Sequence, residues 1–82
     1  LVYILRCHDG SLYTGITTDL ERRTAVHNAG RGARALRGRL PVVPVWSRAM
    51  ADRSAALREE ARIKALTHAA KEQLVRNFPA GC

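Results

Sequence analysis

The stretch that decides the fold is LVYILRC-HDG-SLYTGIT, residues 1–17, because it predicts two strands joined by a short turn. Both flanks are rich in aliphatic, aromatic and β-branched residues, which is typical of strands. A three-residue loop with Gly10 in the left-handed region pairs position 7 with position 11 and places Tyr3 and Tyr13 on one face. A two-residue Asp-Gly turn pairs 8 with 11 and places the tyrosines on opposite faces. A site that uses both tyrosines requires the first register.

A helix is predicted immediately after this hairpin, from Asp19 to Asn28. Thr18 and Glu21 have the spacing of a capping box, in which a threonine hydroxyl and a glutamate three residues later satisfy free backbone amides. Gly30 follows the last turn, where glycine commonly ends a helix.

The remainder of the chain supplies a loop, a strand and two helices. Residues 29–40 read as a basic loop, and its glycines predict that this loop is mobile. The later elements are a strand over 41–46, a helix from Asp52 or Ser54 to about Leu66, and a helix from Thr67 to about Phe78. The two prolines of PVVPVW make that strand an edge strand or an interrupted one. The order β-β-α-β-α-α predicts one α/β domain over residues 1–82, with a three-stranded mixed or antiparallel sheet flanked by helices.

Positive charge is concentrated in the middle of the chain. The net charge is +7, and no acidic residue lies between Glu21 and Asp52, a segment that contains seven arginines. Such a one-sided basic segment favours a polyanion, because guanidinium groups bind phosphate bidentately and release condensed counterions. A solvated surface is the alternative. The residues expected to contact nucleic acid are Arg22, Arg31, Arg34, Arg37 and Arg39.

Other classes of function find little support in the sequence. Cys7 and Cys82 form no CxxC pair, and the absence of a signal peptide predicts reduced thiols in the cytoplasm. The longest apolar run is too short to span a bilayer, so no membrane role is expected. No pattern indicates an obligate protein partner.

Five residues together provide the chemistry of phosphodiester hydrolysis. A tyrosine can orient or deprotonate a water, an arginine can neutralise phosphate, and a carboxylate can bind a cation. The five candidates are Tyr3, Tyr13, Arg23, His27 and Glu60. Arg23 and His27 are spaced i,i+4 and share one helix face. Taken singly, each tyrosine is more often a core residue, and His27 is equally suited to a last helical turn.

The metal ligand is chosen between two adjacent carboxylates. Glu59 and Glu60 point in different directions on a helix, and the position of Ile63 as a core anchor favours Glu60. Glu59 is then expected to pair with a nearby base. One carboxylate makes a water-rich site that suits Mg²⁺, and no His/Cys cluster suggests zinc.

The ordered segments VYI, YTG, an arginine ten residues later and a glutamate in a later helix resemble the GIY-YIG nuclease domain. The resemblance covers nearly the whole chain and is closest to the small single-domain bacterial proteins of this family. It implies that Tyr3 and Tyr13 are the motif tyrosines, that Arg23 and His27 belong to the site, and that Glu60 binds one divalent ion, Mg²⁺ or Mn²⁺. Val2 replaces the glycine of the first motif. Many members have a late asparagine near the site, for which Asn77 is the candidate here.

These features predict a metal-dependent endonuclease that recognises DNA by shape rather than by sequence. A nucleic-acid-binding module of the same fold without activity is the first alternative, and a domain that docks acidic protein partners is the second. A tyrosine with a pKa near 10 is a poor base at neutral pH, so we expect Arg23 and the metal to lower that pKa. Which tyrosine is the base stays open.

Overall fold

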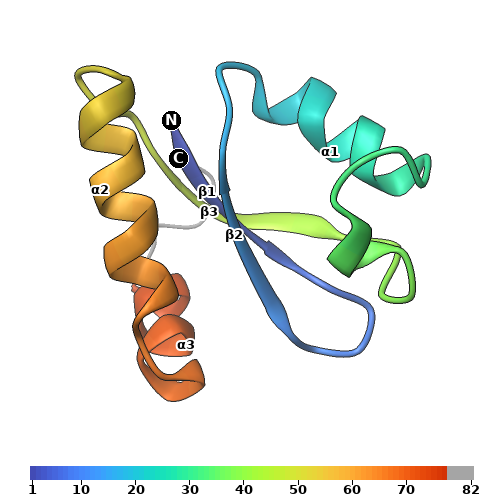
Figure 1. Ribbon diagram of the computed structural model, residues 1–82. Coiled ribbons are helices and arrows are strands. Elements are labelled where there is room, and N and C mark those ends of the chain that lie inside the picture. Colours follow the sequence, from blue (N-terminus) through green and yellow to red (C-terminus); the bar gives the residue numbers. More distant parts are fainter. Residues whose placement is uncertain (78–82) are drawn as a thin grey trace.

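A sheet with helices on both sides forms the protein, whose computed structural model describes residues 1–77 (Figure 1). The sheet consists of β1 (Val2–Arg6), β2 (Leu12–Ile16) and β3 (Val43–Arg48), in the order β2-β1-β3. The helices are α1 (Leu20–Asn28), α2 (Arg53–Lys64) and α3 (His68–Arg76). Both strand pairs are antiparallel, so the predicted α/β architecture and element order are confirmed.

The hairpin adopts the register in which position 7 faces position 11. The Cys7 amide donates to the Ser11 carbonyl at 2.8 Å, and Gly10 has a φ of 87°. Leu5 pairs with Tyr13 across the ladder, and Tyr3 pairs with Gly15. Side chains alternate between faces along a strand, so the two tyrosines emerge on the same side of the sheet. The prediction for this loop is therefore correct.

The third strand is an edge strand with an interruption, as its prolines predict, but it begins later than expected. It spans Val43–Arg48 rather than 41–46, and it pairs with β1 alone. The register shifts between Ile4, which faces Trp46, and Leu5, which faces Pro44. A proline has no N–H for the ladder, which accounts for an irregularity at this point.

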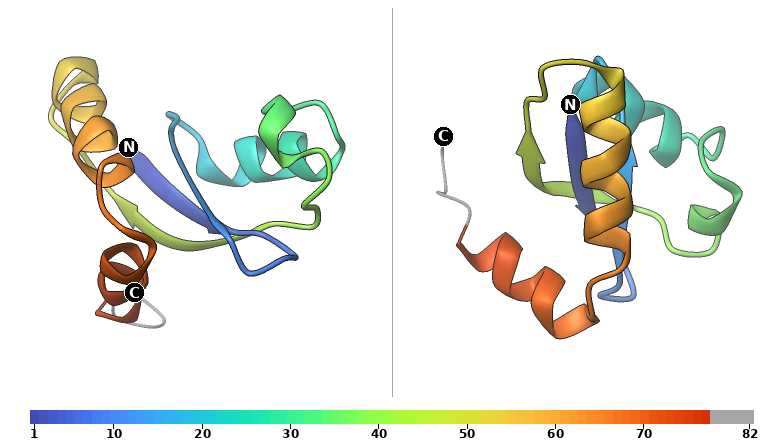
Figure 2. Two further views of the ribbon diagram at one scale, coloured as in Figure 1. Left: turned by 60° about the horizontal axis from the view of Figure 1, so that its bottom comes forward. Right: turned by 60° about the vertical axis from the view of Figure 1, so that its left-hand side comes forward.

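Each face of the sheet has its own core. Apolar residues of the strands pack on one face against α2, with Val2, Ile4, Trp46, Ala56 and Ile63 buried. The other face carries a second cluster that is covered by α1 and the following loop: Tyr3, Leu5, Cys7, Leu36 and Val42. Figure 2 (left) shows α1 and α2 on opposite sides of the strands.

The helix starts differ in part from the sequence expectation. Asp19, not Thr18, caps α1, because its carboxylate accepts from the Arg22 amide at 3.1 Å. Asp52 caps α2, which settles the choice against Ser54, and α2 ends at Lys64. A carboxylate at the N-cap also interacts favourably with the helix dipole, which an uncharged hydroxyl does not.

The third helix begins as predicted, with Thr67 as its cap. It extends over His68–Arg76, and the expected end near Phe78 lies outside the described residues. Arg6 of β1 binds Glu72 through two hydrogen bonds of 2.7 and 2.6 Å. The hydrogen bonds from Arg6 are the main reason that the pKa of Glu72 is lowered to about 2. No helix within residues 1–77 has the length and apolarity needed to cross a membrane.

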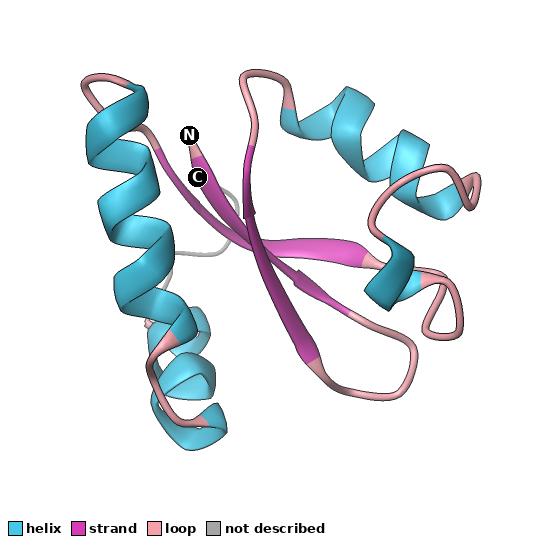
Figure 3. Ribbon diagram, viewed as in Figure 1, coloured by secondary structure: helices cyan, strands magenta, loops and turns pink. Residues whose placement is uncertain are grey.

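The basic loop between α1 and β3, drawn in Figure 3 with its short helical turn, has contacts with the rest of the protein at both ends and in the middle. The Asn28 side chain makes two hydrogen bonds with the Val42 backbone, of 2.7 and 3.0 Å, which join the two ends of the loop. A short 3₁₀ helix, Arg34–Leu36, places Leu36 in the core with 1% exposure. A buried leucine in mid-loop offsets the entropy of ordering it.

Leu36→Ala tests this anchor. We expect the free energy of unfolding to fall by about 2–5 kcal/mol, because the truncation leaves a cavity under the loop. Leu57, which is 43% exposed on α2, provides the control, and Leu57→Ala should change it within about 0.5 kcal/mol. Urea denaturation of both variants measures the difference. Equal stabilities would mean that the loop is not anchored through Leu36.

Candidate active site

The site is built around the hydroxyl of Tyr3, a residue that is only 2% exposed. Gly15 lies directly across the ladder on the same face. A Cβ atom at Gly15 would lie 2.6 Å from the Tyr3 hydroxyl oxygen, closer than such atoms approach one another. The glycine of the YTG segment therefore leaves the space that the phenol of Tyr3 fills.

The ring of Tyr3 packs with two other aromatic rings, those of Tyr13 and His27. Ring centroids lie 6.5 Å apart for Tyr3 and Tyr13, and 6.4 Å apart for Tyr3 and His27. Tyr13 and His27 make an edge-on contact with centroids at 5.6 Å. The hairpin supplies two of the rings and α1 supplies the third, so the hairpin register and the helix position together determine this cluster.

Both ring nitrogens of His27 have partners within the protein. Its Nε2 lies 3.1 Å from the Tyr3 hydroxyl, and its Nδ1 accepts a hydrogen bond from the Ala33 amide at 3.1 Å. The side chain is buried, with 3% exposure. Burial, and secondarily the charge of Arg23, lower the pKa of His27 below its usual value, so the neutral ring is the stable form.

A cleft of about 410 Å³ opens beside these rings. The five residues selected from the sequence all line it: Tyr3, Tyr13, Arg23, His27 and Glu60. A neighbouring cleft of about 470 Å³ shares Arg23 but has no tyrosine, histidine or glutamate in its wall. The smaller cleft is therefore the candidate active site, because it gathers the groups that can act on a phosphodiester.

Glu60 reaches the cleft from the opposite side of the sheet. Helix α2 covers the face of the sheet opposite to Tyr3. Because β2 is an edge strand, the cleft wall can extend from Tyr3 around this edge to Glu60. The Glu60 side chain is 20% exposed, and its nearest cation is Lys64, with Nζ 3.5 Å from Oε2. It is a carboxylate open enough to exchange this weak ion pair for another cation.

Glu59 has the partner role that the sequence predicts. Its carboxylate binds Arg62 at 2.6 Å and Arg48 at 3.3 Å. The hydrogen bond from Arg62 is the main reason that the pKa of Glu59 is below its usual value. Adjacent positions on a helix point about 100° apart, so one carboxylate is engaged in ion pairs while its neighbour faces the cleft.

In the unliganded protein Arg23 alone does not lower the pKa of Tyr3 below its usual value. Burial, followed by Tyr13 and Glu60, raises the pKa of Tyr3 to about 12, although Arg23 acts to lower it. The arginine alone thus fails to make the phenol a base. In the unliganded protein Tyr3 is a protonated phenol at neutral pH.

The donor set fits a metal site of a particular kind. Within residues 1–77 there is no group of three or more His, Cys, Asp or Glu side chains placed to bind a metal ion. Glu60 is the carboxylate in the cleft wall. Mg²⁺ is commonly bound by one or two carboxylates together with waters and substrate phosphate, so a single glutamate is sufficient to fit such an ion.

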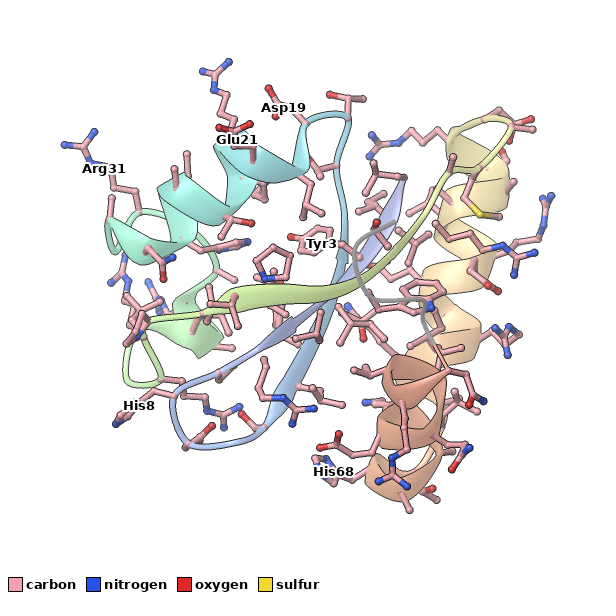
Figure 4. All side chains as sticks on the ribbon, turned by 180° about the vertical axis from the view of Figure 1, so that it is seen from behind. Tyr3, His8, Asp19, Glu21, Arg31 and His68 are labelled. Atoms are coloured by element: carbon pink, nitrogen blue, oxygen red, sulfur yellow. The ribbon has the colours of Figure 1, made fainter. Side chains whose placement is uncertain are left out.

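The basic residues surround the cleft unevenly. Arg31 lies at its wall, and Figure 4 shows the Arg31 side chain extending outward beyond the end of α1, whereas Tyr3 lies between α1 and the sheet. Arg22, Arg34 and Arg37 are exposed. Arg39 differs, because Asp9 approaches its Nε at 3.5 Å. It is the least available of the group for a phosphate.

The remaining candidates lie elsewhere. Asn77 follows α3 as its C-cap and is not part of the cleft wall. The two other histidines, His8 and His68, lie far from Tyr3 in Figure 4. His68 instead contacts Glu72, with Nε2 and Oε2 3.1 Å apart.

Sequence reasoning missed the residues that support the site through their backbone or their small size. Gly15 makes room for Tyr3, Asn28 joins the ends of the loop, and Ala33 binds His27 through its amide. Gly32 is required beside His27, because a Cβ there would lie 1.9 Å from Nδ1. Two of these residues had a signal in the sequence: Gly15 belongs to the YTG motif, and Asn28 is adjacent to His27. No signal in the sequence indicated Ala33.

This fold and cleft define a class of protein, and comparison with known families identifies it. The GIY-YIG catalytic domain matches residues 1–73, and the chain belongs to the GIY-YIG family. This is a nuclease family whose members act on nucleic acid and generally use divalent metal ions.

Within this class the chain is similar to UPF0213 proteins. It is 57% identical over 75 residues to one from Vibrio cholerae, covering 90% of this chain and 74% of the relative. It is 51% identical over 73 residues to one from Halobacterium salinarum, covering 89% and 95%. The solution NMR structure of a UPF0213 protein from Bacillus halodurans matches with a TM-score of 0.62 and 45% identity, over 98% of this chain and 85% of that one.

The buried phenol predicts a decline of stability at high pH. Folding raises the pKa of Tyr3 from 10.0 to about 12, so the folded state retains this proton over a range in which the unfolded chain has lost it. The contribution of the protonated Tyr3 to the free energy of unfolding is constant below pH 10 and is lost as the pH rises from 10 to 12. Absorbance titration of Tyr13→Phe, in which Tyr3 is the sole phenol, measures the pKa of Tyr3 with burial, its main cause, retained and the effect of Tyr13 removed. A midpoint at or below 10 contradicts the burial of a protonated Tyr3.

Proposed function

We propose that this protein is a divalent-metal-dependent endonuclease that hydrolyses phosphodiester bonds, with DNA as the preferred substrate. The observation that carries the proposal is the convergence of two tyrosines, an arginine, a histidine and one open carboxylate on a single cleft. The hairpin, α1 and α2 each contribute to this set. A role in core packing explains a buried tyrosine, but it does not explain why the partly exposed carboxylate of Glu60 lines the same cleft.

The chemistry assigns separate tasks to three of these side chains. Arg23 is exposed at the cleft and balances the charge that develops on the phosphorane. Glu60 would bind the cation, which when present supplies positive charge at the phosphate and at the leaving oxygen. Tyr3 positions the attacking water through its hydroxyl, and it becomes a base only when positive charge in the cleft offsets its burial and the effects of Tyr13 and Glu60.

The basic loop would bind the phosphodiester backbone beside the cleft. Arg31, Arg34 and Arg37 are exposed, and none has a carboxylate partner among residues 1–77. Such contacts position a strand without reading its bases, which favours recognition by shape. A binding module without activity is the second candidate, favoured by the protonated state of Tyr3 in the unliganded site.

Glu60→Gln tests the metal dependence. The substitution removes a charge but keeps the shape, so we expect Mg²⁺-dependent cleavage of labelled DNA substrates to be abolished. Nucleic-acid binding should persist, since a carboxylate repels phosphate. Cleavage that continues in this variant or in EDTA would exclude Glu60 from a metal-dependent mechanism.

The neighbouring carboxylate is the matched control. Glu59→Gln breaks the ion pairs with Arg48 and Arg62 and should lower stability, while metal-dependent cleavage by the folded fraction remains. Thermal unfolding and activity, measured on the same preparations, separate the two effects. Equal loss of activity in both variants would indicate a shared effect on folding and not a metal site at Glu60.

The loop is tested by the salt dependence of binding. Each phosphate contact contributes about 0.9 to the slope of log K against log salt on duplex DNA. Arg31→Ala/Arg34→Ala should therefore reduce the slope by roughly one to two and weaken binding to all sequences alike. Arg53→Ala/Arg58→Ala removes the same charge from α2 and should leave the slope nearly unchanged. If both double variants reduce it equally, the loop is not the phosphate-binding surface.

A further inference from the structure

The Ala33 amide determines which nitrogen of His27 carries the proton. A backbone N–H can only donate, so the 3.1 Å bond from Ala33 requires a lone pair on Nδ1. A neutral imidazole has one N–H, which must then be on Nε2. The direction of the next hydrogen bond follows from this. The Nε2–H of His27 donates to the hydroxyl oxygen of Tyr3 at 3.1 Å.

We propose that Ala33 is a positioning residue that holds His27 as a hydrogen-bond donor to Tyr3, so that His27 orients the phenol and does not take up its proton. The role of Tyr3 in the cleft rests on the proposed nuclease function. The direction of the hydrogen bonds is independent of that function, because it follows from the contacts among Ala33, His27 and Tyr3 alone.

The arrangement leaves His27 no site for another proton. Nε2 already carries one, and protonation of Nδ1 would set its N–H against the N–H of Ala33 and break that bond. Because Tyr3 accepts from His27, its own proton is directed away from the histidine. A donated N–H also stabilises negative charge on the phenol oxygen, which assists Tyr3 when it acts as a base.

Gly32 maintains the contact between Ala33 and His27. A Cβ at Gly32 would lie 1.9 Å from Nδ1, so the loop backbone can pass over the ring only at a glycine. Arg31 and Arg34 directly flank this pair in the sequence. The same four residues therefore carry two phosphate-binding candidates and the amide that orients His27, which connects strand binding to the position of Tyr3.

The direct test is ¹⁵N NMR of protein labelled at histidine, recorded at neutral pH without metal or DNA. We expect the His27 ring to be a single tautomer, with a protonated Nε2 and an unprotonated Nδ1. A proton on Nδ1, or a mixture of the two tautomers, would overturn the proposal. Because this measurement does not depend on cleavage, its failure is distinct from failure of the proposed function.

Two glycine variants of the loop separate the effect of the contact from loop composition. Gly32→Ala should displace Ala33 from His27 and produce a mixture of tautomers. Gly38→Ala is the matched control, because a Cβ there meets no atom within 4 Å, and it should retain the single tautomer. Thermal unfolding shows whether each variant is folded. A folded Gly32→Ala protein with the parental spectrum would contradict the role of Ala33.

Two substitutions of His27 distinguish donation from proton uptake. Gln keeps a donor in the place of Nε2 but accepts no proton, whereas Leu does neither. We expect His27→Gln to cleave DNA within about tenfold of the parent and His27→Leu to be slower by about 10²–10³-fold, the usual cost of removing a hydrogen-bond donor to developing negative charge. An equal loss in both variants would mean that His27 takes up a proton, contrary to the proposal. If the parent does not cleave DNA, the tautomer measurement alone decides.

Discussion

The register of the first hairpin is the constraint on which the site depends. Gly10 has the positive φ that a three-residue loop requires, and the ladder then pairs Tyr3 with Gly15 and Leu5 with Tyr13. A slip of one residue would turn one tyrosine to the α2 face and place a side chain where Gly15 now leaves room. The set of residues that lines the cleft thus depends on the backbone conformation of Gly10, which precedes the YTG segment in the sequence.

The second constraint is the position of the sheet edge. Because β2 is an outer strand, the layers on the two faces of the sheet meet at its side, and a residue of α2 can share a cleft with residues of α1. Ile63 is fully buried, which sets the rotation of α2 about its axis. With that rotation Glu60 faces the cleft and Glu59 binds Arg48 and Arg62. A central strand in the place of β2 would have separated these groups.

Features with a local physical cause could be predicted from the sequence. The element order follows from turn chemistry and apolar patterning. Turn chemistry left two hairpin registers open, and the requirement that both tyrosines share one site chose the register that the structure has. The convergence of the five candidate residues was anticipated through the resemblance to a family. The cap of α1 was placed one residue early, because Thr18 and Asp19 are both good N-caps and only the backbone geometry decides between them.

Features that depend on tertiary burial could not be predicted. Leu36 anchors a loop whose glycines suggest mobility, and no periodic pattern marks a single buried leucine. The raised pKa of Tyr3 likewise depends on burial by residues distant in the chain. The contact of Ala33 with His27 uses a backbone amide, a group that every residue except proline has, so the identity of the side chain gives no indication of it.

The bonds between Asn28 and Val42 give residues 29–41 the character of an exchangeable module. The two ends of this segment are joined through the Asn28 side chain. Within the segment Gly32 and Ala33 contact His27, Leu36 and Leu40 pack in the core, and Arg39 contacts the hairpin loop. For protein engineering, a segment from a relative can be grafted between the same two ends, provided that it keeps the glycine and the amide that contact His27 and the leucine that enters the core.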